Sequence, residues 1–233
     1  RDRSPSRGLG DVYKRQKEDW TLAVALLSVA SITVANLMAI LQGDMKRFMA
    51  FSSISQAGYI LLGVLAGTAQ GMASLVFYVA VYVVANVAVF AVISTVEQHA
   101  GGQTGRDTYR GLYRTNPRLT LVLTLALFSL GGIPPFAGFF SKFFIFAAAF
   151  AQGWWLVVFL ALVNTIVSLF YYLLVVKAMY ISEPLTEDGL PAVAPLRSHP
   201  GVRLTLALCT AGICLLGVAS FVYEGLARWA GMM

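Results

Sequence analysis

The stretch SLGGIPPFAGFFSK, residues 129–142, decides how this chain folds. It joins a Gly-Gly-Ile-Pro-Pro break to a lysine, and both lie inside the apolar run 118–149. A proline pair removes helical hydrogen bonds, and a lysine at bilayer depth costs roughly 2.5–3.5 kcal/mol or more. Keeping both features together is typical of a broken helix that lines a polar cavity, where the cation has a task.

The composition around this stretch indicates an integral membrane protein. The chain is 58% hydrophobic and only 12% charged, whereas soluble domains carry about 25% charged residues. A membrane-spanning helix needs about 20 apolar residues. Six stretches meet this requirement, so we expect an all-α integral membrane fold with six transmembrane helices: 20–42, 47–67, 72–97, 118–149, 154–181 and 202–226.

The fourth stretch is too long for a single helix. As one helix, residues 118–149 would measure roughly 48 Å at ~1.5 Å per residue, against a hydrocarbon core of about 30 Å. Prolines have no N–H to donate, so the carbonyls of Leu130 and Gly131 need water or polar side chains as partners. We therefore predict a discontinuous helix, with the break formed by Gly131, Gly132, Pro134 and Pro135.

The distribution of charge predicts an orientation in a cell (inner) membrane. The second and fourth connections carry no charge. The first, third and fifth connections carry or adjoin basic residues, which are Lys46, Arg47, Arg106, Arg110, Arg114, Arg118, Arg197 and Arg203. By the positive-inside rule, the charged loops face the cytoplasm. The basic segment 1–17 does not fit this pattern, so we expect it to be a non-native or disordered tail before a transmembrane domain at 18–233.

Polar residues recur at helical spacing on three of the expected spans, which are the second, third and fifth. Such stripes on neighbouring helices are what a hydrated path through a bundle requires, although polar residues also bond helices together for ~0.6 kcal/mol each. The candidate path residues are Ser52, Ser55, Gln56, Tyr59, Tyr78, Tyr82, Asn86, Asn164, Ser168 and Tyr172.

Lys142 is the principal candidate for a proton relay. At least seven apolar residues separate it from Gln152, about 15 Å of helix, which is more than a lysine reaches comfortably by snorkelling. Desolvation favours the neutral amine, so small changes in field could load or unload a proton. Lys177 and Glu97 are weaker relay candidates, because Lys177 lies near the polar Ser182 and Glu97 lies near a helix end.

Several classes of site are not predicted. Cys209 and Cys214 have neither a disulfide nor a metal-ligand pattern, and no Gly-rich nucleotide-binding loop follows a strand. We therefore expect no cofactor and no metal on this chain. The tail holds six of the seventeen Lys and Arg residues, so the net charge gives no reason to expect nucleic-acid binding.

Two blocks of sequence resemble the antiporter-like membrane subunits of respiratory complex I, the proton-translocating NADH:quinone oxidoreductase. They are NLMAILQGDMKRFMAFSSISQAGYILLG (36–63) and LFSLGGIPPFAGFFSKFFIF (127–146). Two further phrases favour the subunit N branch of this family: YRGLYRTNPRLTLVLTLALFSLGGIPP and FYYLLVVKAMYI. The resemblance implies the second of two inverted repeats plus a closing helix, so this chain would be the C-terminal part of a longer subunit.

The resemblance also implies a function. It places the proton-channel lysine at Lys142, and it makes other membrane subunits, the lipid bilayer and protons the partners. NADH, FMN, iron–sulfur clusters and quinone would act elsewhere in the complex. One departure is Gln56, which stands where related subunits often carry histidine; a glutamine orients water but takes up no proton.

Other functions remain open at this stage. A multisubunit Na⁺/H⁺ antiporter and a membrane-bound hydrogenase contain subunits with the same fold. A truncated helix bundle without transport of its own is an alternative of another class.

Overall fold

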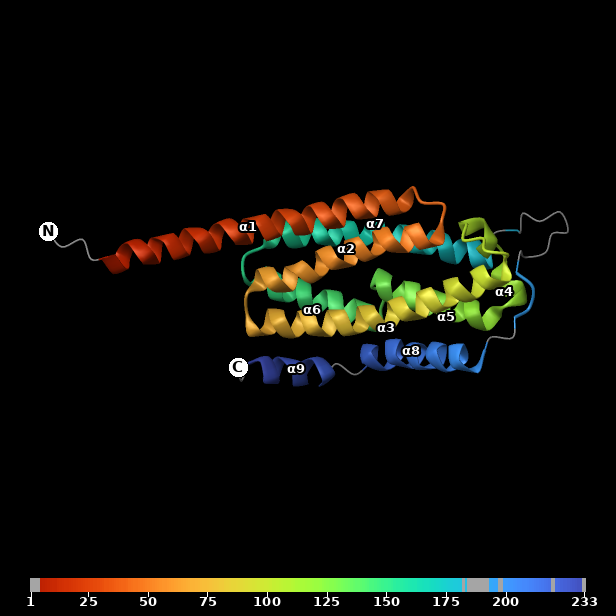
Figure 1. Cartoon of the computed structure of the whole chain (residues 1–233). Helices are drawn as coiled ribbons and strands as arrows, with labels where there is room; N and C mark the ends of the chain where they lie inside the picture. Colours follow the sequence, from red (N-terminus) through yellow and green to blue (C-terminus); the bar gives the residue numbers. More distant parts are fainter. Residues whose placement is uncertain (1–4, 182, 184–192, 197–198, 219–220, 232–233) are drawn as a thin grey trace.

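The computed structural model describes residues 5–181, 183, 193–196, 199–218 and 221–231, and every element in this part of the chain is helical (Figure 1). Arg197 and most of the expected fifth loop lie outside the described residues. The helices are α1 (Pro5–Ile40), α2 (Met45–Ala66), α3 (Ala69–His99), the 3₁₀ helix η1 (Arg106–Tyr109), α4 (Leu112–Thr115), α5 (Pro117–Gly131), α6 (Ala137–Ala151), α7 (Trp155–Tyr180), α8 (Pro200–Val218) and α9 (Phe221–Gly231).

Within the described residues, five helices are long and apolar enough to cross a membrane: Asp19–Ile40 of α1, α2, α3, α7 and α8. The expected fourth span is two helices, α5 and α6, of 15 residues each. Each measures about 22 Å at ~1.5 Å per residue, less than a bilayer core. A crossing by α5 and α6 together as one broken span stays a prediction.

Two ends of the chain differ from the expected spans. The last expected span, 202–226, corresponds to two helices, α8 and α9, and residues 219–220 between them are outside the description. Helix α1 begins at Pro5, so it continues through residues 5–17, which show no helical periodicity in the sequence. Adding residues to an existing helix is far easier than nucleating one, and proline suits a first helical position. The non-native origin of the tail stays a prediction.

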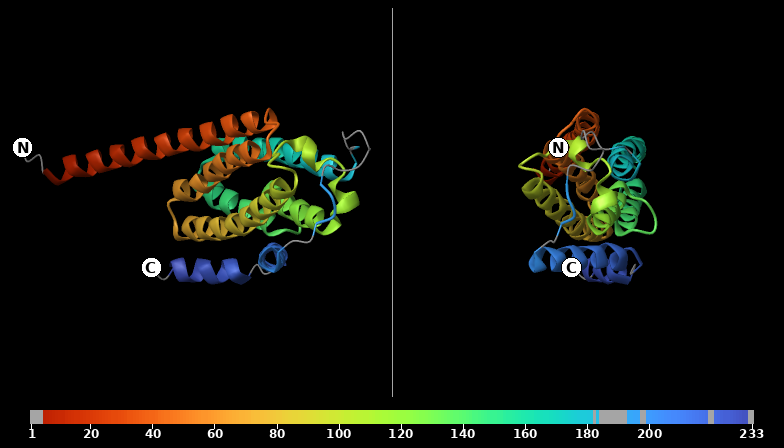
Figure 2. Two further views of the ribbon diagram at one scale, coloured as in Figure 1. Left: turned by 45° about the vertical axis from the view of Figure 1, so that its right-hand side comes forward. Right: turned by 90° about the vertical axis from the view of Figure 1, so that its right-hand side faces the viewer.

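The long helices run side by side, so the connections gather at two ends of the bundle (Figure 1). One end, called here the charged-loop end, holds the connections 41–44 and 100–116 and the residues 193–196. The opposite end holds the turns 67–68 and 152–154. Helix α1 lies on one side of the bundle and α8 with α9 on the other, as the two turned views also show (Figure 2).

The outer surface of the bundle is apolar. Large hydrophobic side chains remain exposed on several of its helices, among them Leu26 on α1, Leu156 and Ile166 on α7, and Leu208 on α8. Soluble proteins rarely expose such continuous apolar surface, whereas helices in contact with lipid do so along their length. The exposed side chains therefore fit a bundle that lies in a membrane.

Candidate functional site

The break between α5 and α6 follows directly from its glycines and prolines. Helix α5 ends at Gly131, and Gly132 adopts a left-handed backbone conformation with φ 83°. The amides of Gly132 and Ile133 both donate to the carbonyl of Phe128, at 3.0 Å. A glycine after the last helical residue allows this cap because it has no Cβ, and the prolines that follow stop the helix from resuming.

The two carbonyls that the prolines leave without helical donors are bonded by polar side chains. Gln56 Nε2, from α2, donates to the Leu130 carbonyl at 3.3 Å. Lys142 Nζ, from α6, donates to the Gly131 carbonyl at 3.4 Å. The sequence-based expectation that these acceptors require polar partners is therefore confirmed in the structure. One partner, Gln56, is a candidate path residue, and the other, Lys142, is the relay candidate.

Gly138 allows α6 to approach the end of α5 closely. Its backbone amide donates to Ser129 Oγ at 3.1 Å, and a Cβ at this position would overlap the Ser129 carbonyl oxygen. One helical turn later, this approach places Lys142 beside the carboxyl end of α5. The carboxyl end of a helix carries a partial negative charge, which favours a cation there.

Lys142 is buried, with only 4% of its surface exposed. Its ammonium nitrogen lies 4.9 Å from the centre of the Tyr59 ring, a favourable cation–π geometry. Across the described residues, no carboxylate pairs with it. The charged form is therefore supported by a carbonyl, a ring and a helix end rather than by a full negative charge.

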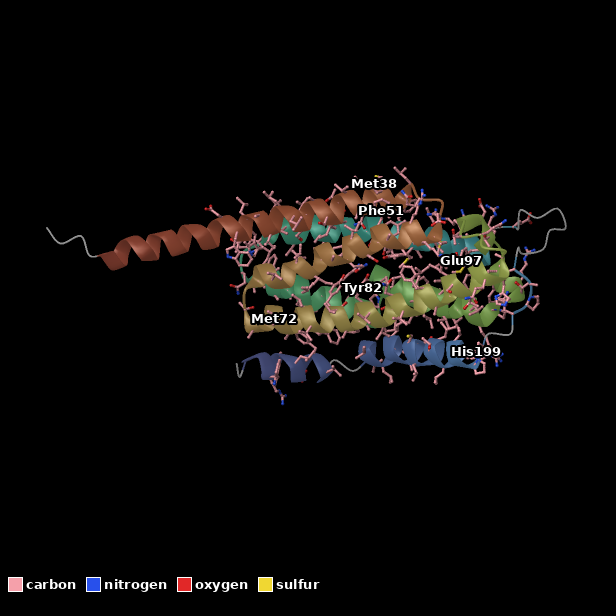
Figure 3. All side chains as sticks on the ribbon, viewed as in Figure 1. Met38, Phe51, Met72, Tyr82, Glu97 and His199 are labelled. Carbon is pink, nitrogen blue, oxygen red and sulfur yellow. The ribbon has the colours of Figure 1, made fainter. Side chains whose placement is uncertain are left out.

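A small cavity connects Lys142 to other polar groups. It holds about 10 Å³ of space for water, which is about the room one water molecule needs, and its lining includes Gln56, Tyr78, Tyr82, Ser129, Ser141 and Lys142. Tyr82 lies in the middle of the bundle (Figure 3). A single water in this cavity could join the lysine to hydroxyl and amide groups on α2 and α3.

Gln56 is the centre of a buried chain of hydrogen bonds. Its Oε1 accepts from the Tyr78 hydroxyl at 2.6 Å, and its Nε2 also donates to the Tyr172 hydroxyl at 3.3 Å. Tyr172 in turn bonds Ser52 Oγ at 2.5 Å. The stripes expected on the second, third and fifth spans therefore meet at Gln56, Tyr78 and Tyr172.

A second buried group joins α1 to α7, and sequence reasoning missed one of its members. The Tyr171 hydroxyl donates to Asn36 Oδ1 at 2.9 Å, and Asn36 Nδ2 lies 3.3 Å from Asn164 Oδ1. Asn164 therefore bonds Asn36 rather than the Gln56 chain. Asn36 could have been found in the sequence as a single amide side chain within the apolar run of the first span.

The other candidate path residues lie outside the Gln56 chain. Asn86 Nδ2 donates to the Tyr82 hydroxyl one turn earlier at 3.2 Å, and Ser168 Oγ donates to the Thr165 carbonyl of its own helix at 2.8 Å. The Tyr59 hydroxyl accepts from Thr165 Oγ1 at 3.4 Å. Ser55 Oγ is buried and has no partner in the part of the chain that the structure describes.

An aromatic layer separates the Gln56 chain from the charged-loop end. Phe48 packs edge-on against Tyr171 and Tyr172, with ring centres 5.3 and 5.9 Å apart. The guanidinium of Arg106 covers the other side of this layer, 5.6 Å from the Phe48 ring centre. Burial lowers the pKa of Arg106. Ser52 is thus the member of the hydrogen-bonded Gln56 chain that lies nearest to Phe48 and the charged-loop end.

Glu97 and Asp44 lie at the surface of the charged-loop end (Figure 3 labels Glu97). Glu97 pairs with Lys46 at 2.6 Å, with side chains 27% and 49% exposed respectively. Asp44 caps α2 through the Arg47 amide at 2.9 Å and accepts from Thr104. Partial burial raises the pKa of Asp44, but these hydrogen bonds outweigh it and hold the pKa below its usual value. The structure therefore does not bring Glu97 to Lys142.

Lys177 also lies apart from Lys142. It is exposed on the outer face of α7, in an open apolar groove whose lining includes Phe170, Leu173 and Tyr180. None of the described residues forms an ion pair with it. Within the described ranges, no group of His, Cys, Asp and Glu side chains could hold a metal ion.

Known proteins share both the sequence and the fold. The family described as NADH:quinone oxidoreductase/Mrp antiporter, transmembrane, matches residues 9–168. NADH-quinone oxidoreductase subunit N of Phocaeicola vulgatus is 59% identical over 213 residues, 91% of this chain and 44% of that protein. The subunit N of Azobacteroides pseudotrichonymphae is 51% identical over the same shares. The chain thus spans less than half the length of these curated relatives.

Solved structures give the same result. A chain of respiratory complex I from Thermus thermophilus with bound aureothin is 34% identical, with a TM-score of 0.71 over 88% of this chain and 45% of that chain. The Mrp complex from Dietzia has a TM-score of 0.80 over 91% of this chain and 46% of that chain, but at 22% identity the likeness concerns the fold alone. Together with the family match, these likenesses show that the chain belongs to the NADH:quinone oxidoreductase/Mrp antiporter transmembrane family.

Proposed function

We propose that this chain is the proton-translocating C-terminal part of a membrane subunit of NADH:quinone oxidoreductase, of the subunit N type. The relatives at 59% and 51% identity carry that name. The activity belongs to a whole complex, in which NADH, FMN, iron–sulfur clusters and quinone act on other subunits. The partners of this chain are then other membrane subunits of the complex, the lipid bilayer and protons.

The observation that carries the proposal is the position of Lys142. A buried lysine without a carboxylate is expensive at bilayer depth, and a purely structural bundle would gain nothing by retaining it. Here its nitrogen lies at the Gly131 carbonyl and beside a cavity of about the size of one water. A buried amine with room for one water beside it is placed to exchange a proton with that water.

The chemistry requires only that the Lys142 amine gains and loses one proton. In the uptake step, a water in the cavity donates a proton to the neutral amine and is itself reprotonated from the Gln56 side. In the release step, the ammonium gives this proton to water on the opposite side. Gln56 orients water through its amide but carries no proton, so transfer past it runs through water and the hydroxyls of Tyr78 and Tyr172.

The direction follows from the charged loops. With these loops on the cytoplasmic side of the cell membrane, the chain from Ser52 to Gln56 lies between Lys142 and the cytoplasm. Protons would load from that side and leave toward the turns at 67–68 and 152–154. Quinone reduction elsewhere in the complex would supply the energy, by changing the field at Lys142.

The antiporter alternative rests on fold likeness. The Mrp complex and the membrane-bound sulfane sulfur reductase have TM-scores of 0.80, at 22% and 27% identity. The higher identities belong to NADH-quinone oxidoreductase subunits, so we favour that assembly.

The test compares two lysines in the full-length subunit within its assembled complex. We expect Lys142→Ala to leave assembly intact and to depress both proton pumping and the coupled quinone reductase rate. Lys177→Ala removes the same group from an exposed position and should change pumping little. Pumping by Lys142→Ala at the unmodified rate, measured in sealed proteoliposomes with a pH-sensitive dye, would refute the role of Lys142.

A further inference from the structure

An open groove lies at the charged-loop end, between the first turns of α5 and α8. Its volume is about 430 Å³, and it lies well away from Lys142. Residues from three segments line it: Asn116, Arg118 and Val122 near the start of α5, Leu196 from the fifth connection, and Arg203 and Leu206 from α8. These segments meet because the Asn116 side chain bonds the backbone of the connection, donating to the Ala194 carbonyl at 3.0 Å and accepting from the Leu196 amide at 2.8 Å.

The groove is cationic. Arg118 and Arg203 come from helices far apart in the sequence, and both line it. Neither guanidinium has an ion pair in the ranges that the structure describes, and none of the lining residues is acidic. Both side chains are exposed. Two guanidinium groups that line one groove without a counter-charge favour the binding of an anion.

The walls of the groove are apolar and lead away from the two arginines along the helices. Leu119 and Val122 continue along α5, and Leu206 and Ala207 along α8. Helix α8 is one of the helices apolar enough to cross a membrane, and its outer side chains Leu204 and Leu208 are 62% and 64% exposed. The arginines therefore lie where α8 begins, which for a membrane-crossing helix is the headgroup region.

We infer that this groove binds one anionic phospholipid. Its phosphate lies between the guanidinium groups of Arg118 and Arg203, because arginine presents paired donors that match phosphate oxygens. One acyl chain lies along Val122, Leu206 and Ala207. Basic pockets between transmembrane helices at the cytoplasmic surface are suited to such headgroups. The inference is independent of any proton transfer at Lys142.

Lipid retention by the purified chain tests the inference. The chain is reconstituted in nanodiscs of phosphatidylcholine with a minor fraction of phosphatidylglycerol, extracted in mild detergent and weighed by native mass spectrometry. We expect one phosphatidylglycerol to be retained in preference to phosphatidylcholine. The double variant Arg118→Gln, Arg203→Gln should weaken this retention about 30-fold, because each arginine near a membrane surface strengthens the binding of an anionic lipid about fivefold.

Two further variants separate the site from general charge. Arg114→Gln removes a guanidinium from the same loop but outside the groove, so retention should be unchanged. Ala207→Trp fills the apolar wall without changing charge and should reduce retention. Circular dichroism of each variant checks that the helices are intact.

The inference would be overturned by equal retention of the two lipids by the unmodified chain. Equal loss of phosphatidylglycerol in Arg114→Gln and in the double variant would also overturn it, as would full retention by folded Ala207→Trp. Inorganic phosphate that competes fully with phosphatidylglycerol at millimolar concentration would identify a free-anion site and would also contradict the lipid assignment.

Discussion

The two halves of α2 differ in the polar side chains that they bury. The half toward the charged-loop end buries Ser52 and Gln56, which belong to a hydrogen-bonded chain with Tyr172 and Tyr78. The half toward the opposite end buries Leu62 and Leu65. These leucines pack in an apolar cluster that also contains Ile145, Phe146, Val157 and Val158.

Lys142 lies at the boundary between these halves. Its cavity touches Gln56 on the polar side, and its ammonium covers the ring of Tyr59, which belongs to the apolar cluster. A proton on Lys142 thus has polar neighbours toward the charged-loop end and a dry cluster toward the other end. In this conformation the hydrogen-bonded chain reaches Lys142 from one side only, and the Phe48 layer closes that chain off from the charged-loop end.

The largest effect is expected where the boundary itself is built. Gly138→Ala places a Cβ onto the Ser129 carbonyl, so α6 must move away from α5 and carry Lys142 from the Gly131 carbonyl. We expect a loss of about 3 kcal/mol in the free energy of unfolding, at the upper range of overpacking. Denaturant titration followed by tryptophan fluorescence measures it. Gly43→Ala is the control, because an added Cβ at this position meets no atom within 4 Å. It should change the free energy of unfolding little.

The polar half can be interrupted at its centre. Gln56→Leu leaves the Tyr78 hydroxyl and the Leu130 carbonyl without their partner, each at a cost of about 1 kcal/mol. Breaking these hydrogen bonds should raise the barrier to proton transfer, and we expect pumping by the full-length subunit to slow roughly tenfold. Gln70→Leu, at an exposed glutamine, should pump normally. Equal pumping by the two variants in assembled complexes would show that the Gln56 chain only joins helices.

The apolar half can be opened. Leu62 is fully buried, and Leu62→Asn places an amide in the dry cluster that separates Lys142 from the uncharged end. We expect water to enter and protons to leak back, measured as faster collapse of an imposed pH gradient in proteoliposomes. The exposed Leu41→Asn serves as control. An unchanged rate of collapse of the pH gradient with Leu62→Asn would mean that this cluster is not the barrier to protons.

The smallest effect is expected at the surface of the polar half. Glu97→Gln removes the exposed ion pair with Lys46, which is worth about 1 kcal/mol or less and is screened by salt. Pumping should stay near the unmodified rate, and the small loss in unfolding free energy should vanish in high salt. A severe pumping defect would instead place Glu97 on the proton path.

The sequence was most informative where chemistry leaves few alternatives. Glycines and prolines predicted the break, and the missing proline N–H groups predicted that the Leu130 and Gly131 carbonyls need polar partners. The hydroxyl and amide stripes identified Gln56, Tyr78 and Tyr172, which the structure brings together. Their role in proton movement stays a prediction.

The hydrogen-bond partners and helix ends that the sequence did not predict depend on how the helices pack and propagate. Ser168 bonds its own helix, as serines in helices often do, and no periodicity reveals which serine turns to a neighbouring helix. Asn36 joins Tyr171 and Asn164 across helices, and its partners emerge only when α1 packs on α7. The ends of helices depend on cooperative propagation, which is why α1 extends back to Pro5.

The measurement that tests the central claim most directly is proton pumping by the full-length subunit with Lys142→Arg, in an assembled complex. Arginine keeps the positive charge and a donor for the Gly131 carbonyl, but it does not release its proton. We predict an assembled complex with pumping depressed to the level of Lys142→Ala. Pumping at the unmodified rate would contradict the account, because it would mean that charge alone, rather than a proton that comes and goes, is what position 142 supplies.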